Sequence, residues 1–325
     1  MEFRTKIEIT GVPGLISYDS NVMFIGSCFA NEMGKNFHLG KMNTLVNPFG
    51  VLYNPGSTAH ALELMMSDMV YTDEDIYFHD NRYLSFDHDT SFSSASSEEC
   101  LQRINSSLTE ARRFLHKASF LFVTFGTARV FRWKKDNRLV ANCHKIPASD
   151  FTRHLLNAED ITAIWEDLID RLRRFNKDLK IIFTVSPVRH LKDGAYGNQV
   201  SKSVLFTAID HLLAHDNKLS YFPSYEIMID ELRDYRFYKK DMIHPSDVAV
   251  EYIWERLRES YFSRDTEEIY RRIIKISEAR QHVIGGNDPD ALSRFKESML
   301  TRIHRLKNDY PFIDLGEEEE YFNNI

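Results

Sequence analysis

The sequence has few cysteines, few glycines and prolines, and no excess of basic charge. Its 325 residues include three cysteines, 13 glycines and nine prolines, and the net charge is −7. Three cysteines without paired spacing form neither a disulfide framework nor a zinc cluster, so we expect no metal site and no cofactor. The acidic balance offers no basic surface for phosphates, so a nucleic-acid partner is not expected.

Long hydrophobic runs are also missing. No apolar run approaches the roughly 18 residues that a membrane-spanning helix needs, so no span is expected. The first residues, Met1 to Lys6, lack the apolar core of a signal peptide. A cytoplasmic location is therefore expected, where a reducing environment would keep the cysteines free. The oligomeric state stays open.

Buried strands alternate with amphipathic helices along most of the chain. Such alternation is typical of a doubly wound parallel sheet with right-handed crossovers, so the predicted fold class is α/β. Strands are expected at 22–25, 43–46, 120–126, 180–185 and 219–222. Helices are expected from about 28 and at 58–66, 97–116, 158–175, 200–214 and from about 246.

The rest of the chain predicts smaller elements and a helical end. A hairpin is expected around the turn at Asp136-Asn137, and another within 76–86. Beyond Arg264, two long amphipathic helices are expected at about 265–284 and 289–308, separated by 285–287, and then an acidic tail from Glu317. The predicted domains are residues 15–262 and a helical C-terminal extension over 263–325. The apolar stripe of the last long helix either packs on its own domain or forms a dimer contact.

The segment from Val22 to Gly34 organises the chain. It predicts a buried strand, a turn at Gly26-Ser27-Cys28, and a helix with Phe29 and Met33 on one face. Gly26 has no Cβ and permits a tight turn out of the strand. Cys28 then lies at the helix N-terminus, where the helix dipole and unpaired N–H groups favour a thiolate. The alternative is a buried structural thiol.

Residues 26–30, Gly-Ser-Cys-Phe-Ala, resemble the signature of the GSCFA family, which is similar to the SGNH or GDSL-type hydrolases. In that resemblance Cys28 takes the place of the nucleophilic serine, although Ser27 is also a nucleophile type. The Asp241-Met-Ile-His244 segment matches the Asp-x-x-His block that completes the SGNH triad. The resemblance implies that His244 takes the proton of Cys28 and that Asp241 holds the imidazole.

Two further segments resemble the oxyanion-binding blocks of SGNH hydrolases. Asn47-Pro-Phe-Gly50 resembles the second block, which implies that the Gly50 N–H, together with the Cys28 N–H, binds the oxyanion. A plain turn is the alternative.

The third block, Gly-x-Asn, corresponds to residues 126–128, where Ala128 stands in the place of the asparagine. Thr127, Asn47 or Arg129 could replace the missing donor, and the sequence does not choose among them.

These polar segments follow predicted strands, and the carboxyl ends of parallel strands share one edge of a sheet. Arg189 and His190 follow another strand and could contact an anionic or carbonyl-bearing substrate. We expect a Cys-His-Asp hydrolase or acyltransferase that acts on an ester, thioester or other acyl compound, acylated glycans included. The alternative is a non-catalytic binding module that retains the SGNH-like cleft.

Overall fold

An entirely parallel five-stranded sheet lies at the centre of the protein. The structure is a computed structural model that describes residues 4–10, 15–281 and 289–325. The strand order is β10-β9-β5-β1-β2, so the chain begins in the sheet at β1, adds β2 at one edge and then crosses to the other side. This order confirms the doubly wound α/β fold. The strands are β1 (Val22–Gly26), β2 (Thr44–Val46), β5 (Phe120–Phe125), β9 (Lys180–Val185) and β10 (Leu219–Tyr221).

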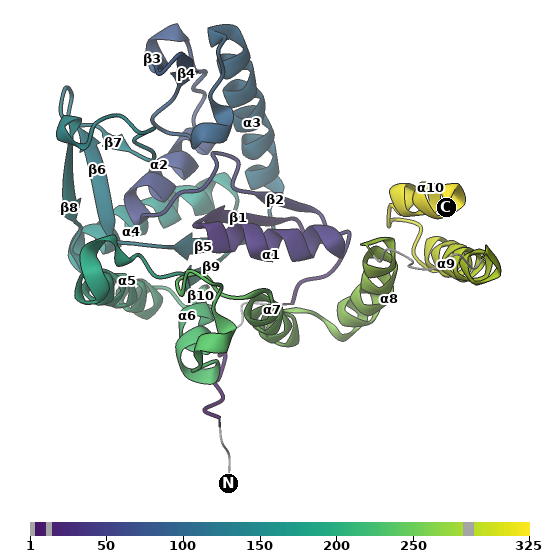
Figure 1. Ribbon diagram of the computed structural model, residues 1–325. Coiled ribbons are helices and arrows are strands. Elements are labelled where there is room, and N and C mark those ends of the chain that lie inside the picture. The colour runs from purple at the N-terminus through teal and green to yellow at the C-terminus, as the bar shows by residue number, and fades with distance from the viewer. Residues whose placement is uncertain (1–3, 11–14, 282–288) are drawn as a thin grey trace.

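Both faces of the sheet are apolar, because successive side chains of a strand point to opposite faces. Met23 and Ile25 of β1 pack in one core, and Val22 and Phe24 pack in the other. Helices α2, α3, α4 and α5 cover the first face, whereas α1 and α7 cover the second (Figure 1). Their bounds are α1 Cys28–Leu39, α2 Pro55–Met66, α3 Ser97–Lys117, α4 Ala158–Phe175, α5 Gly194–His215 and α7 Asp247–Tyr261.

Two small antiparallel sheets lie outside the central one. The predicted hairpins are present as β3 (Tyr77–His79) with β4 (Arg82–Leu84), and as β6 (Arg129–Trp133) with β7 (Leu139–Val140). The short helices are η1 Asp73–Asp75, η2 Thr90–Phe92, η3 Ala148–Asp150, η4 Leu191–Asp193, α6 Ser224–Glu226, η5 Ile227–Glu231 and η6 Tyr235–Phe237.

Strand β8 and the first turns of helix α5 are among the elements that were not predicted. Strand β8 (Phe151–Leu155) pairs with β6, and its three middle residues are exposed and polar. Backbone pairing forms this edge strand without an apolar alternation that a sequence pattern could show. Helix α5 begins at Gly194 rather than near residue 200. Its first turns carry small and polar residues, so no apolar stripe in the sequence marks this start.

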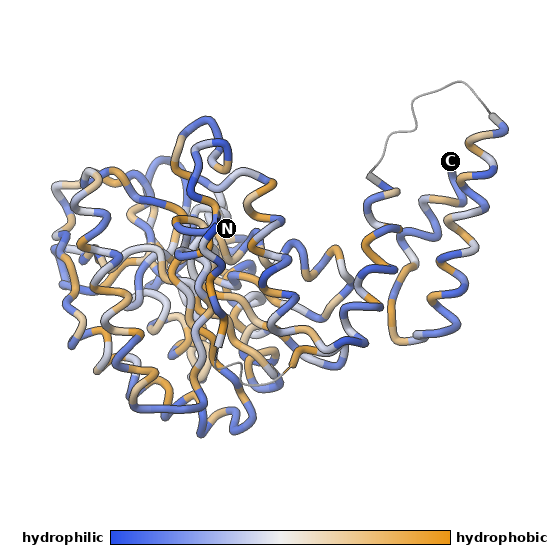
Figure 2. The backbone as a smooth tube through the Cα atoms, turned by 90° about the horizontal axis from the view of Figure 1, so that it is seen from below, coloured by the Kyte–Doolittle hydropathy of each residue, from blue (hydrophilic) through white to orange (hydrophobic). Residues whose placement is uncertain are grey.

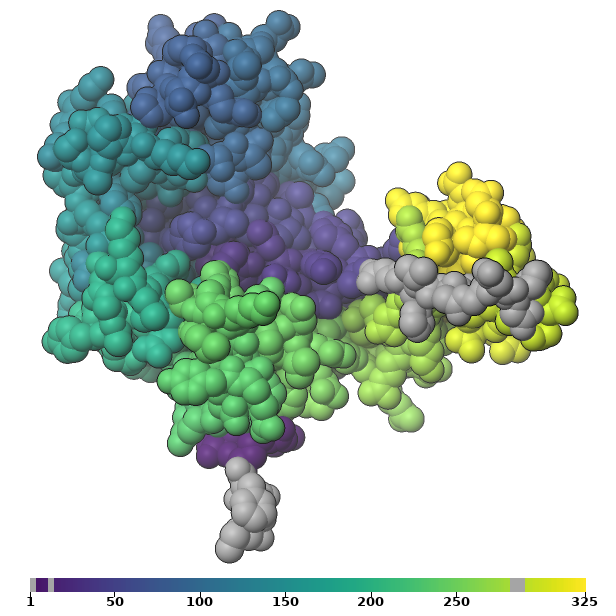
Figure 3. All heavy atoms as spheres, viewed as in Figure 1, coloured from purple at the N-terminus to yellow at the C-terminus, as the bar shows by residue number. Residues whose placement is uncertain are grey.

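The C-terminal extension is helical, as expected. It comprises α8 (Arg264–Gln281), α9 (Pro289–Asp309) and α10 (Gly316–Asn324). Figures 2 and 3 show α9 and α10 to one side of the main body, to which α8 connects them. The first half of α8 packs on the main body, where Trp254 Nε1 donates to the Tyr270 hydroxyl at 2.8 Å. The predicted break at 285–287 lies outside the described residues.

The predicted acidic tail is instead a packed helix. Phe322 of α10 is buried in a separate core with Ile273 of α8 and with Ile303 and Leu306 of α9. The acidic residues at the start of α10 are paired with cations, for example Glu319 with Lys307 at 2.6 Å. The apolar stripe of α9 therefore packs within its own chain.

No helix in the described parts of the chain is long and apolar enough to cross a membrane.

Candidate functional site

The turn between β1 and α1 depends on Gly26. This glycine has a φ of +131°, and a Cβ at this position would lie 2.1 Å from the Thr124 carbonyl oxygen of β5. The next residue continues the contact with β5, since the Ser27 N–H donates to the same oxygen at 3.0 Å. The turn lies where the chain changes direction across the sheet, between β1 and β5, and this is where open α/β sheets bind ligands.

Ser27 and Cys28 differ in exposure. Ser27 is 1% exposed, and its Oγ has no hydrogen-bond partner among the described residues. Cys28, by contrast, is half-buried and carries a free thiol at the first position of α1. Of the two, Cys28 is the residue that a substrate can reach.

The pKa of Cys28 is raised rather than lowered. Burial is the largest cause, and the Glu32 carboxylate one turn along α1 adds to it. The N–H groups of Cys28 and Phe29 and the Lys202 ammonium act in the opposite direction but do not outweigh burial. The predicted lowering of the thiol pKa is therefore wrong. The sequence pattern indicated that Cys28 lies at a helix N-terminus, but it did not indicate how deeply the turn is buried.

Asn47 supports the Cys28 turn from β2. Its side-chain oxygen accepts a hydrogen bond from the Gly26 N–H at 2.8 Å, and its side-chain nitrogen donates to Asn31 Oδ1 of α1 at 2.6 Å. The Gly50 N–H donates to the Asn47 carbonyl at 2.7 Å, and the Asp89 side chain occupies the space beside Gly50. Both predicted oxyanion donors of this segment are thus engaged within the protein.

The segment after β5 is also engaged. Thr127 Oγ1 lies 2.9 Å from the Ser201 hydroxyl of α5, and the same hydroxyl accepts from the Ala128 N–H at 2.8 Å. Arg129 forms an ion pair with Asp193 at 2.9 Å. These contacts hold Thr127 against α5 and Arg129 against Asp193 at the end of η4.

His190 lies beside the Cys28 turn. Both residues, His190 and Ser27, lie next to Gly126: a Cβ built on Gly126 would be 3.3 Å from His190 Nε2 and 3.4 Å from Ser27 Cβ. The His190 ring meets the Tyr53 ring edge to face, with 5.5 Å between the ring centres, and the His190 backbone N–H donates to Asn198 Oδ1 at 2.8 Å. Burial, with the nearby cations, lowers the pKa of His190 to about 4, so the ring is neutral at pH 7.

Asp241 and His244 form the predicted pair. Asp241 Oδ2 lies 2.6 Å from His244 Nδ1, and Asp241 Oδ1 accepts from the Ile243 and His244 N–H groups at 2.9 and 3.0 Å. These hydrogen bonds, led by the one from the His244 backbone, lower the pKa of Asp241 to about 2. Both side chains are about half exposed, at 46% and 47%.

The loop that carries this pair leads into α7, which packs against α1. No hydrogen bond joins Cys28 Sγ to His244 within the described ranges. The structure therefore brings His244 to Asp241 and leaves the third member of the predicted triad apart from them. Catalytic hydrogen bonds are often longer in ligand-free enzymes and tighten in the substrate complex.

Sequence reasoning missed Asn198, Ser201 and Lys202. All three are buried, and they contact the loops that follow β5 and β9. Their spacing of three to four residues places them on the same face of α5 as Leu205, which is in the core. Polar residues in phase with an apolar helical stripe are the signal that could have identified them.

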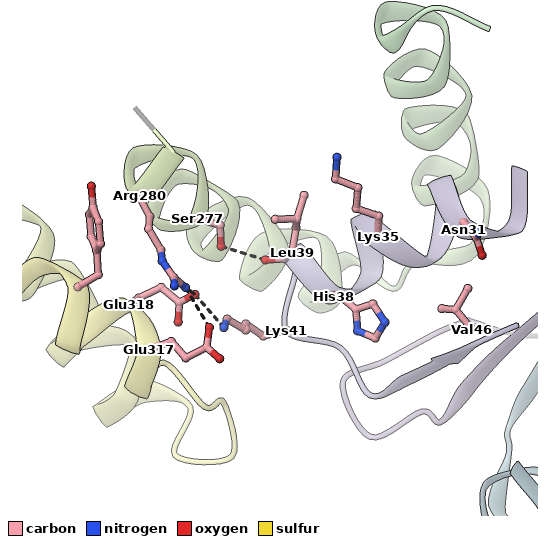
Figure 4. Close-up of a pocket in the computed structure, with 11 residues that line it drawn as sticks. Asn31, Lys35, His38, Leu39, Lys41, Val46, Ser277, Arg280, Glu317 and Glu318 are labelled. Carbon is pink, nitrogen blue, oxygen red and sulfur yellow. Dashed lines mark hydrogen bonds and ion pairs between the residues drawn. The ribbon is translucent and has the colours of Figure 1, made fainter. Parts of the chain in front are cut away.

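A cavity of about 750 Å³ lies beside α1, between the main body and the C-terminal helices (Figure 4). Cys28 is not among its lining residues, although Asn31, one turn along α1, is. At this cavity Lys41 of the main body forms an ion pair with Glu318 of α10 at 2.8 Å, and Arg280 of α8 forms one with Glu317 of α10 at 3.0 Å. The cavity therefore lies at the interface between the extension and the main body, which the Lys41–Glu318 ion pair joins.

The described residues contain no group of three or more His, Cys, Asp or Glu that could hold a metal ion.

Several solved structures show a distant likeness. A Streptococcus pneumonia protein whose description refers to platelet activating factor is 13% identical, with 75% of this chain and 84% of that chain covered and a TM-score of 0.39. A carbohydrate esterase family 2 enzyme with a carbohydrate binding domain from Corynascus thermopiles (Myceliophthora fergusii) is 12% identical, with 80% and 68% covered and a TM-score of 0.37. A family two carbohydrate esterase from Clostridium thermocellum, in complex with cellohexaose, is 14% identical, with 79% and 66% covered and a TM-score of 0.35.

No curated protein matches the sequence. A family model described as GSCFA family matches residues 21–257, which include every predicted site residue.

Proposed function

The chain belongs to the GSCFA family, and from this premise we propose that it is an SGNH-like hydrolase or acyltransferase with Cys28 as its nucleophile. The observation that carries the proposal is the hydrogen-bonded Asp241–His244 pair, 2.6 Å apart, on the loop before α7. When a carboxylate accepts a hydrogen bond from Nδ1, Nε2 is the ring nitrogen that can accept a proton. This is the arrangement of the general base in a nucleophilic triad.

The proposed reaction has two steps. In the first, His244 Nε2 takes the Cys28 proton, the sulfur bonds to the acyl carbon, and the bond from that carbon to the leaving oxygen or sulfur breaks. The leaving group departs with the proton from His244. In the second step His244 takes a proton from a water or another acceptor, which attacks the acyl carbon of the thioester. The C–S bond breaks, and the proton returns from His244 to the Cys28 sulfur. The Cys28 N–H, at the N-terminus of α1, is the proposed oxyanion donor.

The proposed substrates are acyl esters and thioesters, acylated sugars among them. Arg189 and His190 follow β9 at the same sheet edge, and Tyr53 contacts the His190 ring. These side chains are the proposed contacts for the part of the substrate beyond the acyl group. A series of p-nitrophenyl esters of increasing chain length, acyl thioesters and acetylated sugars tests the class of substrate directly.

His244→Ala is expected to lower kcat/KM by about 10³-fold, because general acid–base catalysis contributes roughly 10²–10⁴-fold. Asp241→Asn is expected to have a smaller effect. The imidazole of His244 remains, but it loses the carboxylate that orients it and stabilises its charged form. The measurement is steady-state kinetics on the best ester or thioester of the series.

His190→Ala is the matched control. It removes a second imidazole at the same sheet edge, but the burial that lowers its pKa to about 4 makes it a weak base at pH 7. We expect a change mainly in KM. If His190→Ala is inactive while His244→Ala retains its activity, the base is assigned to the wrong histidine.

A further inference from the structure

The N-terminal arm, residues 4–10, is bonded to the main body through the main chain of one residue. The Ile7 N–H donates to Glu231 Oε1 at 2.6 Å, and an Arg256 guanidinium N–H donates to the Ile7 carbonyl. Glu231 ends η5, and Arg256 lies on α7. In Figures 1 and 3 the arm is the purple segment below the green one that contains η5 and α7. Ile7 therefore joins two separate elements.

Glu231 and Arg256 form a buried ion pair. Glu231 Oε1 lies 3.4 Å from Arg256 Nη2, and the two side chains are 0% and 8% exposed. Charges taken out of water are stabilised only when further hydrogen bonds satisfy their remaining oxygens and N–H groups. The Tyr252 hydroxyl of α7 donates to Glu231 Oε2, and the Ile7 main chain bonds to both partners. The arm is thus part of what stabilises this pair.

The arm bonds to this pair as one strand bonds to another. A residue that uses its N–H and its C=O toward the same neighbour has the pattern of a hydrogen-bonded residue in an antiparallel strand pair. Burial alternates with a period of two, as in a strand. Ile7 and Ile9 are half-buried and pack against the core under α1 and α7, whereas the arm residues on either side of them are exposed. No strand of the described chain pairs with residues 4–10, so the ion pair takes the place of a neighbouring strand.

The arm is loosely packed apart from these contacts. Arg4 lies over the Tyr252 ring, 5.3 Å from its centre. A cavity of about 1020 Å³ lies beside the arm and is lined by it and by the last turns of α7. With open space along the arm, its docking depends on the main chain of Ile7 and on the two isoleucine side chains.

The two partners of Ile7 lie on either side of the loop that carries the Asp241–His244 pair. Residues 232–246 connect η5 to α7. This loop also bonds to itself, since the Lys239 N–H donates to the His244 carbonyl at 2.8 Å. Because Ile7 is bonded to both flanking elements, the arm ties together the two ends of the loop.

We propose that Glu231 and Arg256 form a binding site for extended main chain, and that the arm occupies it as a strap that ties η5 to α7 and fixes the loop between them. The partner that fits this surface is a peptide in strand conformation with apolar side chains at alternate positions. A role of the strap in turnover rests on the proposed function, because the loop carries His244. The docking itself does not, so it is tested without a substrate.

The first test is amide hydrogen exchange of residues 232–246, measured by mass spectrometry on the full chain. Ile7→Pro removes the N–H that Glu231 accepts. Glu8→Pro is the matched control, since the Glu8 N–H makes no hydrogen bond among the described residues. We expect exchange at least about tenfold faster in Ile7→Pro, the effect of one hydrogen bond to a charged group, and wild-type exchange in Glu8→Pro. Melting temperatures show whether both variants are folded.

The second test supplies the strap as a separate peptide. A synthetic peptide with the sequence of residues 4–10 is added to the Ile7→Pro variant at about 5 mM, comparable with the effective concentration of a tethered segment. We expect it to restore slow exchange of residues 232–246. The same peptide N-methylated at Ile7 keeps the side chain but lacks the N–H, and it should restore nothing. N-methylation at Glu8 is the control and should have no effect.

Equal exchange in the two proline variants overturns the proposal. So does an unmodified peptide that restores nothing, or one that acts equally well when it is methylated at Ile7. Faster exchange in Ile7→Pro alone, reversed by the unmodified peptide, supports the proposal even if the protein turns over no acyl compound. In that case the proposed function fails on its own test, and the strap stands.

Discussion

Cys28→Ala is expected to lower kcat/KM for an acyl substrate by at least about 10³-fold, the largest effect of any single substitution at this site. Members of a nucleophilic triad act as a unit, so removing the attacking atom leaves only binding and oxyanion stabilisation. Cys28→Ser should retain measurable turnover, because a hydroxyl beside a base can still attack an acyl carbon. Steady-state kinetics and trapping of the acyl-enzyme by mass spectrometry measure both.

Ser27→Ala is the matched control for this experiment. It removes a neighbouring nucleophile that is 1% exposed. We expect turnover to stay within about tenfold of wild type, the range of a surface or packing change rather than of a lost nucleophile. An inactive Ser27→Ala with an active Cys28→Ala would reverse the assignment. If the wild-type protein binds acyl compounds but turns over none of them, the protein is a binding module.

Gly26→Ala is expected to cost about 4 kcal/mol or more of folding free energy, which few single substitutions do. Two effects add at this position. The φ of +131° is one that residues with a Cβ rarely adopt, and the added Cβ would lie 2.1 Å from the Thr124 carbonyl oxygen, which is backbone of the adjacent strand. The strands β1 and β5 would have to separate at the centre of the sheet. Urea denaturation followed by circular dichroism measures the loss.

Gly194→Ala separates the two effects. Gly194 has a φ of +70° and a ψ of 174°, yet among the described residues no atom beyond its chain neighbours and the adjacent helix backbone lies within 4 Å of a Cβ built on it. Its substitution should therefore cost only the backbone term, about 1–3 kcal/mol. Equal losses in the two variants would show that the contact with Thr124 has no effect, and the account of the turn given above would be wrong.

The local patterns of the sequence predicted most of the fold. The apolar run from Val22 and the run from Phe120 are strands β1 and β5, and the stripe that starts after Asn157 is helix α4, with the Asn157 side chain accepting from the Asp160 N–H at 2.7 Å. Strand β8 could not be predicted in this way. Its exposed polar residues follow from pairing with β6, which lies some 20 residues earlier in the chain.

The local part of the candidate site was also predictable. The Asp241–His244 contact joins residues three apart, and the Gly26 turn follows from a glycine between a strand and a helix. Contacts of this range depend on a few neighbouring residues, so their pattern is present in the sequence itself.

The environment of Cys28 was decided by the tertiary structure. The Asn47 side chain that holds Gly26, the hydrogen bond that engages the Gly50 N–H, and the buried Lys202 all come from segments that only packing brings together. The sequence placed Cys28 at a helix N-terminus, which lowers a thiol pKa, but the depth of the turn raises it further than the helix lowers it. Burial depends on every segment packed around an atom, and no short stretch of sequence contains that sum.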